Sequence, residues 1–375
     1  MVDVVVIGGG VIGCSIAFHL ARQPRVRVLV VEKGSIASGM TKRSGGLVRS
    51  YFSFEPEARL ALTSLRYFQN WNEIVGGNGT FTPTGLVVVA GEENAPDLKA
   101  NVTRLRGIGA NMLTVSPAEL KELQPAAQVE DVALAAYEPD SGYLDSVAAT
   151  QALAARAKAR GAIFHTGTFV KSILVERGRV TGVETTSGPI EALTVVLAAG
   201  PWSDRLLKPL GLEIGIRTET SQVAFFERPP DLKNGHAAFL DLITGAYFRP
   251  HTYGLCLGGL NTQDTETLPN PDQFDEKVDP AFVGDVQRRV ATRLPAMAKA
   301  RFVRGHTGVY DMTPDVHPVL DRVPGIHGLV LAAGFSGLGF GWAPAVGACI
   351  AELVTDGAAS TLDLRPFRFS RFQGE

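Results

Sequence analysis

Blocks of apolar and polar positions at the start of the chain predict a strand, a helix and a second strand. Residues 2–7 form an apolar run rich in β-branched side chains, typical of a strand buried on both faces in a parallel sheet. A glycine-rich turn follows at 8–13, and 14–22 carry apolar residues at helical spacing. A further apolar run, 26–31, ends at Glu32. We therefore predict a complete βαβ unit at the N-terminus.

In the rest of the chain, the spacing of apolar residues differs from segment to segment and predicts several helices and strands. Helical spacing predicts helices at 56–71, 146–160, 280–293 and 342–355, and Ser116 with Glu119 forms the capping box of another. Strands are expected at 86–90, 162–170, 171–176, 179–185, 193–199 and 329–333. Residues 216–260 alternate with a period of two, which predicts an antiparallel sheet, and the polar stretch 261–279 is expected to be a surface excursion. We predict one discontinuous α/β domain with a β-rich domain inserted into it.

The first glycine-rich turn has the context of a dinucleotide-binding fingerprint, since a strand precedes it and a helix follows. Gly8 permits the tight turn, Gly10 the approach of a pyrophosphate, and Gly13 the close packing of helix on strand. The start of the helix offers N–H groups to phosphates. Glu32 suits the ribose hydroxyls of an adenosine and disfavours NADP. At this point both NAD and FAD fit the pattern.

A second glycine-rich turn, 334–341, precedes the last helix and favours FAD. Backbone N–H groups and a helix N-terminus there would stabilise the negative charge of a reduced flavin. A turn that merely packs helix on sheet is the alternative. Val170, ahead of a strand pair, is a candidate for backbone contact with an adenine.

Composition and charge remove several classes of partner. The chain has 375 residues, 45% hydrophobic and 20% charged, with a formal net charge of −2. No basic field argues for nucleic acid or an anionic membrane. No run is long enough to span a membrane, and no signal peptide is evident, so we expect a cytoplasmic protein. Cys14, Cys256 and Cys349 show no disulfide or metal spacing, and we expect small buried side chains and no metal.

Six segments, in order along nearly the whole chain, resemble the D-amino-acid oxidase superfamily. They read IGGGVIGCSIAFHLAR, VVEKG, ASGMTKRSGGLVRSY, YFRPHTYGLCLGG, YDMTPDVHPVLD and LAAGFSGLGFGWAPAVG. The branch they resemble most holds glycine oxidase, monomeric sarcosine oxidase and the β subunit of heterotetrameric sarcosine oxidase. The resemblance implies FAD and oxidation of a C–N bond in an amino acid or N-alkylglycine, by hydride transfer to flavin N5.

The chain departs from that family pattern in three places. Gly308 stands where monomeric sarcosine oxidases attach FAD through a cysteine, so non-covalent FAD is expected. The lysines of that type, in the central strand and the late turn, are absent, which leaves oxidase and dehydrogenase both open. Tyr310 stands where glycine oxidase and D-amino-acid oxidase have a carboxylate-binding arginine.

Candidate substrate contacts follow from the need to bind a carboxylate, for which the planar fork of arginine is suited. Arg249 and Arg49 are the first candidates, and Arg49 matches an arginine of the sarcosine oxidase branch near the flavin. A structural partner is the alternative for each. Tyr247 and Tyr310 are candidates to bound or bind the substrate, His251 to act as base or ligand, and Trp342 to wall the pocket. No dedicated side-chain base is required, because the cofactor accepts the hydride and the protein only positions the substrate.

The expected architecture is a Rossmann-type FAD-binding domain from 1–80, 146–214 and 301–375, with an inserted antiparallel β-rich substrate domain from 81–145 and 215–300. Beyond the glycines, Glu32 and Val170 named above, contacts to FAD are expected from Val11, Ile12, Lys33, Ser38, Thr41, Arg43, Ser44, Gly45, Gly46, Ala199, Gly200, Trp202, Gly334, Ser336, Gly337, Leu338, Gly339 and Phe340.

The leading hypothesis is oxidation of a small or N-substituted amino acid to an imine, with O2 as acceptor and H2O2 as product. The alternatives are a proline or D-amino-acid dehydrogenase with another electron acceptor, an NAD(P)H-dependent flavin monooxygenase, a non-catalytic flavin-binding assembly protein, and an enzyme that uses NAD alone. No second dinucleotide fingerprint supports the monooxygenase. A monomer, a homo-oligomer and a hetero-complex all remain open.

Overall fold

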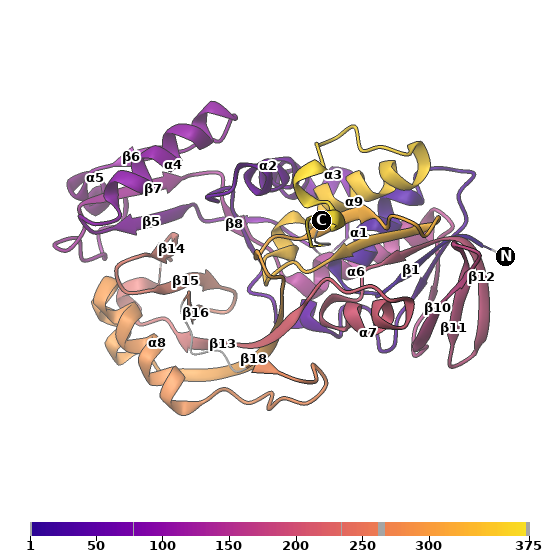
Figure 1. Cartoon of the computed structure of the whole chain (residues 1–375). Coiled ribbons are helices and arrows are strands. Elements are labelled where there is room, and N and C mark those ends of the chain that lie inside the picture. The colour runs from indigo at the N-terminus through magenta and orange to yellow at the C-terminus, as the bar shows by residue number, and fades with distance from the viewer. Residues whose placement is uncertain (1, 78, 234, 262–266, 373–375) are drawn as a thin grey trace.

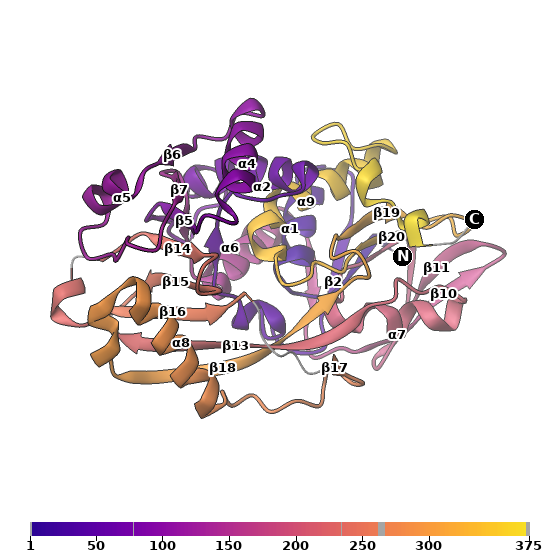
Figure 2. The same ribbon diagram turned by 60° about the vertical axis from the view of Figure 1, so that its left-hand side comes forward.

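Two large β-sheets dominate the molecule and lie toward its opposite ends (Figures 1 and 2). The computed structural model describes residues 2–77, 79–233, 235–261 and 267–372. Within this part, an eight-stranded sheet contains the N-terminal strand, and a nine-stranded sheet contains most strands of the inserted segments. A third sheet has three short strands. The three strands are β3 (Leu47–Val48), β8 (Gly142–Tyr143) and β4 (Thr82–Pro83).

The eight-stranded sheet has a parallel centre. β1 (Val2–Ile7) lies between β2 (Val28–Val31) and β12 (Gly188–Leu197), with Ile7 opposite Val31 and Leu197. β9 (Ile163–His165) extends the sheet beyond β2, and β20 (Leu329–Ala333) pairs with β12. The antiparallel strands are β10 (Val170–Glu176), β11 (Arg179–Thr185) and β19 (Val319–Arg322). The buried, β-branched run of β1 thus occupies the central position that its composition predicts.

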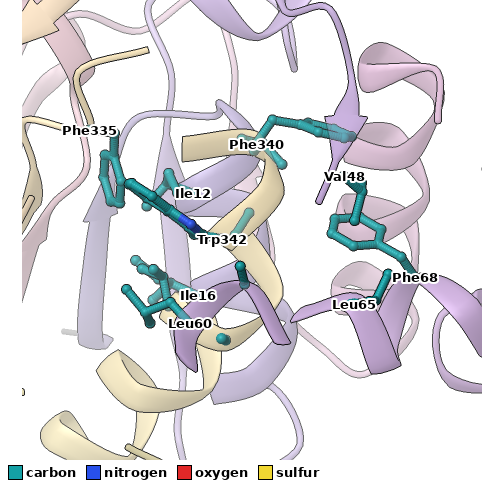
Figure 3. Close-up of a cluster of buried hydrophobic side chains, with 14 of the residues drawn as sticks. Ile12, Ile16, Val48, Leu60, Leu65, Phe68, Phe335, Phe340 and Trp342 are labelled. Atoms are coloured by element: carbon teal, nitrogen blue, oxygen red, sulfur yellow. The ribbon is translucent and has the colours of Figure 1, made fainter. Parts of the chain in front are cut away.

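Helices from distant parts of the chain cover one face of this sheet. These are α1 (Val11–Leu20), α6 (Ser146–Ala159), α9 (Gly339–Asp356) and α2 (Glu55–Gln69), whose side chains share one core with Val4 and Val6. Figure 3 shows Trp342 of α9 packed beside Ile12 and Ile16 of α1 and Leu60 of α2. Trp342 is fully buried in this core, so the prediction that it walls the substrate pocket is wrong.

The nine-stranded sheet follows the order β17-β13-β16-β15-β14-β5-β7-β6, with β18 also paired to β13. The strands are β5 (Leu86–Ala90), β6 (Leu113–Val115), β7 (Leu134–Glu138), β13 (Arg217–Glu227), β14 (Ala238–Asp241), β15 (Ala246–His251), β16 (Leu255–Leu260), β17 (Thr267–Leu268) and β18 (Phe302–Met312). The inserted sheet was predicted to be antiparallel, but one of its strand pairs is parallel: β14 runs parallel to β5. α8 (Pro280–Arg293) packs Val286 and Val290 against Phe226 and Phe248 on one face.

β18 differs most from the predicted division of the chain. The predicted boundary assigns 301–312 to the FAD-binding part, yet β18 pairs with β13 in the nine-stranded sheet from Phe302 to Met312. The strand is long enough to run from the α8 core to the late glycine-rich turn, and sequence periodicity carries no sign of that span. The remaining domain boundaries stay a prediction.

The other elements are short. They are α3 (Trp71–Ile74), α4 (Ala95–Gly107), α5 (Pro117–Leu123), α7 (Ser203–Leu207), η1 (Met40–Arg43), η2 (Gly200–Trp202), η3 (Lys208–Leu210), η4 (Pro230–Leu232), η5 (Pro295–Lys299), η6 (Arg365–Phe367) and η7 (Phe369–Phe372). The capping box of Ser116 and Glu119 is confirmed at the start of α5. Helix α9 starts at Gly339, before the predicted residue 342, because the second glycine-rich turn is already helical at its end. The three cysteines are free and buried, as predicted. Among the described residues, no helix is sufficiently long and apolar to cross a membrane.

Two buried histidines make the stability of the fold depend on pH. His19 and His236 are buried, and burial lowers their pKa values to about 3 and about 4. Both are neutral in the folded state near pH 7, whereas the unfolded chain protonates near the ordinary pKa of about 6.5. Between these values the unfolded state binds more protons, so the free energy of unfolding decreases as the pH decreases.

We expect each of these histidines to contribute about 1.4 kcal/mol of lost stability per pH unit below about pH 6.5. Chemical denaturation at about pH 7 and about pH 5, with FAD in excess, measures the slope. The His236→Gln variant should lose less stability over that interval than the unmodified protein. Equal losses in both proteins would show that His236 does not contribute.

Candidate active site

A cavity of about 670 Å³ lies where the two sheets approach each other. It is bordered by the carboxyl ends of β1, β2 and β12, by η1, by the start of β10, by strands β13, β15 and β18, and by the late glycine-rich turn. Ligands of open α/β sheets bind outside the carboxyl ends of the strands, and this cavity has the size of a cofactor site. We therefore take it as the candidate active site.

The glycines of the first turn shape its base. Gly8 has a φ of +109°, and a Cβ there would overlap the carbonyl of Ala198 on the neighbouring strand. A Cβ on Gly13 would overlap the carbonyl of Gly8, so α1 approaches β1 only because both residues are glycine. The start of α1 then faces the cavity with Gly10, Val11 and Ile12. The arrangement fits the pyrophosphate of a dinucleotide.

Glu32 lies at the end of β2 and lines the cavity. Its two carboxylate oxygens accept hydrogen bonds from the backbone N–H of Gly9 and of Gly34, each at 2.7 Å. These bonds fix the carboxylate and leave each oxygen a further acceptor position. The geometry fits the ribose hydroxyls that the sequence predicts as its ligands.

Thr41 of η1 has a structural role that spacing does not reveal. Its hydroxyl accepts the N–H of Val11 at 3.0 Å, and its carbonyl accepts the hydroxyl of Ser146 at 2.8 Å. Since Gly10 provides no side-chain cap for α1, Thr41 supplies one from outside the helix. η1 is thereby tied to the starts of α1 and α6.

The late turn is fixed by a carboxylate that the sequence prediction missed. Asp311, next to Tyr310 on β18, accepts the backbone N–H groups of Gly334 at 3.2 Å and Phe335 at 3.1 Å. Burial raises the pKa of Asp311 to about 6, and the two N–H donors oppose that rise. An acid beside a tyrosine in an apolar strand was the available signal, but its partners lie more than twenty residues away.

We expect the Asp311→Ala variant to bind FAD about tenfold more weakly, because two buried N–H groups of the late turn lose their acceptor, at a cost of about 1–3 kcal/mol. Asp311→Asn keeps a carbonyl acceptor and is the matched control, with affinity close to that of the unmodified protein. Titration of the apoprotein with FAD, followed by flavin fluorescence, measures both. Equal affinity of the alanine variant would contradict the role of Asp311.

Two predicted catalytic residues, Tyr247 and Tyr310, line the cavity together. Each ring lies on a glycine: a Cβ on Gly337 would come within 2.6 Å of Tyr310, and a Cβ on Gly259 would overlap Tyr247. Burial, followed by the charge and hydrogen bond of Tyr310, raises the pKa of Tyr247 well above its usual value. Tyr247 is therefore a neutral hydroxyl at physiological pH and a standing hydrogen-bond donor.

Arg249 lies behind the cavity wall rather than in it. Its Nε donates to the carbonyl of Gly45 at 2.7 Å, Nη2 contacts the same oxygen, and Nη1 donates to the carbonyl of Pro250 at 2.8 Å. The guanidinium lies 4.1 Å above the ring of Tyr143, and burial lowers its pKa to about 10. No carboxylate of the described residues pairs with it, so backbone carbonyls and the ring of Tyr143 stabilise this cation.

Arg49 follows β3 and, like Arg249, does not border the cavity in the described structure. It contacts the carbonyl of Tyr51 and lies 4.0 Å from the ring centre of Phe52. Burial lowers its pKa to about 10, and Glu138 and Glu57 partly offset that effect. Neither carboxylate forms an ion pair with Arg49 within the part of the chain that the structure describes.

His251 does not reach the cavity. Its ring lies 5.1 Å from that of Phe225, and its Nδ1 is 3.3 Å from Nη1 of Arg249. Burial first, and then the charges of Arg249 and Arg304, lower its pKa to about 4. The neutral imidazole of His251 therefore contacts the guanidinium of Arg249, and it is too far from the cavity to act as a base for a substrate there.

Most predicted cofactor contacts face the same space. Those that line the cavity are Gly8, Gly10, Val11, Ile12, Glu32, Lys33, Ser38, Thr41, Arg43, Ser44, Gly45, Val170, Ala199, Gly200, Trp202, Gly337, Gly339 and Phe340. Five others do not border it in the described structure: Gly13, Gly46, Gly334, Ser336 and Leu338, which shape the turns instead.

Sequence reasoning also missed several lining residues. Ser221 and Val223 come from β13, Gly308 and Val309 from β18, Lys171 from β10, and Arg205 from α7. Pro271, Asp272, Phe274 and Glu276 come from the stretch predicted as a surface excursion. Most of the described stretch is exposed as predicted, but its role as a wall of the cavity was not predicted, and 262–266 lie outside the described residues. Neither cysteine nor histidine is among the described residues that line the cavity.

Comparison with known proteins decides between the dinucleotides. Residues 3–353 match the DAO family, described as FAD dependent oxidoreductase. The chain belongs to this family. It is an FAD-dependent oxidoreductase, and the resemblance to the D-amino-acid oxidase group is confirmed.

Relatives of known sequence or structure extend over nearly the whole chain. It is 31% identical over 418 residues to the FAD-dependent oxidoreductase domain-containing protein 1 of Bos taurus, covering 99% of this chain and 84% of the relative. It is 30% identical to glycine oxidase of Geobacillus kaustophilus, covering 100% and 98%. The crystal structure of L-proline dehydrogenase from P. horikoshii superposes with a TM-score of 0.92 at 30% identity, covering 99% and 98%.

Proposed function

We propose that this oxidoreductase oxidises the C–N bond of a small or N-substituted amino acid of the glycine, sarcosine or N-carboxymethyl-amine type, giving an imine that hydrolyses. The supporting observation is the pair of tyrosines at the cavity, together with Arg249 and Arg49, neither of which forms an ion pair with a described carboxylate. A small ligand with a carboxylate would accept hydrogen bonds from the tyrosines and would provide a negative charge for the arginines. Glycine oxidase and L-proline dehydrogenase, among the similar proteins, act on ligands of this kind by name.

Within this proposal the chain binds and orients the substrate. The hydroxyls of Tyr247 and Tyr310 donate to the substrate carboxylate, and Arg249 and Arg49 provide the positive potential that stabilises it. FAD, when bound, supplies flavin N5 as the acceptor of the substrate hydride. The rings of Tyr310 and Tyr247 pack directly on Gly337 and Gly259, where a Cβ would overlap them. This packing holds both rings at the cavity and limits the space left for a substrate side chain.

The proton on the substrate nitrogen is handled without a dedicated base. His251 is neutral but lies away from the cavity, and the described carboxylates that border it, Glu32, Asp272, Glu276 and Asp311, are committed to other contacts. Desolvation and the nearby arginines lower the pKa of the bound amine, so that it binds in its neutral form. The C–H bond then breaks as hydride, the nitrogen lone pair forms the C=N bond, and the remaining proton goes to water.

Non-covalent FAD belongs to the same proposal. Gly308 borders the cavity where the family resemblance places an attachment cysteine, and the stem of Arg43 fills the space, with its Cβ 3.2 Å from the position of a Gly308 Cβ. Acid precipitation of the protein should leave the flavin in the supernatant. A yellow pellet would show covalent attachment.

An amino-acid dehydrogenase is the second candidate. It is favoured by the likeness to L-proline dehydrogenase and by the absence of lysine from the segment Tyr247 to His251. A panel of glycine, sarcosine, N-carboxymethyl amines, L-proline and D-amino acids, read out by peroxide formation and by dye reduction, separates the candidates. Peroxide with a small amine supports the oxidase, and dye reduction without peroxide the dehydrogenase. Failure of every amine to bleach the flavin under anaerobic conditions would overturn both.

A further inference from the structure

A segment of the substrate-binding half lies across the cofactor cavity. Residues 269–277, here called the strap, connect β17 to the approach of α8. Pro271, Asp272, Phe274 and Glu276 of the strap line the same cavity as the fingerprint residues Gly8 to Ile12. The strap is therefore part of the wall that a bound FAD would face.

Asp272 fixes the strap through three donors, which come from the loop after β2, from η2 and from α7. Lys33 Nζ lies 2.9 Å from Oδ1, Trp202 Nε1 donates to Oδ1 at 2.8 Å, and Arg205 Nη1 lies 2.7 Å from Oδ2. Lys33 also lies 3.5 Å above the centre of the Trp202 ring. Partial burial alone would raise the pKa of Asp272, but these donors lower it, so the carboxylate stays charged at neutral pH.

Asn270 and Glu276 hold the strap on either side of Asp272. The side-chain oxygen of Asn270 accepts the backbone N–H of Asp272 at 2.9 Å and contacts Arg205. Glu276 forms an ion pair with Arg43, whose side chain is 8% exposed and lies against Gly308. The anchors thus run from Lys33, next to the ribose ligand Glu32, to η1 and β18.

We propose that the strap, fixed by Asp272, retains FAD in the cavity by covering the side from Lys33 to Arg43. The adenosine diphosphate half of the cofactor is the group it covers, because the strap and Glu32 border the same space. The cofactor leaves by this side only after Asp272 separates from its three donors. The inference rests on FAD binding alone and is independent of the substrate.

The test is the rate at which FAD leaves the purified holoprotein after dilution, followed by the fluorescence of released flavin. We expect Asp272→Asn and Asp272→Ala to release FAD about tenfold faster, which corresponds to about 1.4 kcal/mol. Asp275→Asn is the matched control, since it changes the same charge in the same strap at a residue that does not border the cavity in the described structure. The control should release FAD at the unmodified rate.

Salt gives an independent readout, because exposed ion pairs weaken as ionic strength increases. Release from the unmodified protein should accelerate with salt, and the Asp272 variants should lose most of that dependence. If those variants do not fold, Asn270→Ala removes the neighbouring anchor without substituting a lining residue and should also accelerate release. Release from the Asp272 or Asn270 variants at the rate of Asp275→Asn would overturn the proposal.

Discussion

Arg249→Ala should raise the KM for the amino-acid substrate by about two orders of magnitude. Removing one partner of a buried charged contact costs about 2–5 kcal/mol, and each 1.4 kcal/mol is tenfold. Arg249 is 4% exposed and has no described anion, so its positive potential behind the cavity wall is available to a substrate carboxylate. Steady-state kinetics with the amine that reacts best in the panel measure KM and kcat separately.

Two further variants make this result interpretable. Arg249→Lys keeps the charge but loses the fork that spans Gly45 and Pro250, so it should recover part of the affinity. Arg49→Ala removes the second candidate arginine, which follows β3 and is less buried than Arg249. The ratio of flavin to protein absorbance must be the same in all three, because Arg249 also holds the 44–46 loop. An unchanged KM in Arg249→Ala, with full flavin content, would exclude Arg249 as a source of the positive potential that holds the substrate carboxylate.

Gly13→Ala should abolish FAD binding and destabilise the fold by about 4 kcal/mol or more, the range reserved for severe core defects. A Cβ at this position overlaps the backbone carbonyl of Gly8. Because no flexible side chain can move aside there, the overlap can be relieved only if α1 moves away from β1. Thermal unfolding and the flavin content of the purified variant measure the two effects.

Gly284→Ala is the control for Gly13→Ala. Gly284 lies inside α8 with nothing within 4 Å of a new Cβ, so alanine should stabilise the protein by up to about 1 kcal/mol. Flavin content near that of the unmodified protein in Gly13→Ala would show that the close approach of helix and strand is not required.

The parts of the fold that the sequence predicts well are those fixed by neighbours in the chain. β1, its glycine-rich turn and Glu32 lie within one βαβ unit, where steric need and hydrogen bonding act over a few residues. β5, α8 and β20 are likewise found at their predicted bounds, because each is a short run of one clear period. The late turn was recognised from its glycines, although three of its predicted contacts, Gly334, Ser336 and Leu338, do not border the cavity in the described structure.

The parts that escaped prediction depend on contacts between distant segments. Arg249 meets Gly45 across 204 positions, and Asp272 meets Lys33 across 239. A polar stretch such as 269–277 looks like any solvated loop until its partners are in place. The parallel pairing of β14 with β5 has the same origin, since alternation along a strand shows which residues face the core and not the direction of its neighbour.

The β13–β18 ribbon has a consequence for any attempt to divide this protein. Tyr310 and Asp311, which border the cavity and hold the late turn, sit on a strand whose other end, at Phe302, pairs with Phe226 of the α8 core. A fragment that keeps the nucleotide fingerprint but omits the inserted sheet would lose the pairing that positions both residues. The two halves are therefore not interchangeable modules, and a chimera that swaps substrate specificity must transfer β13 and β18 together.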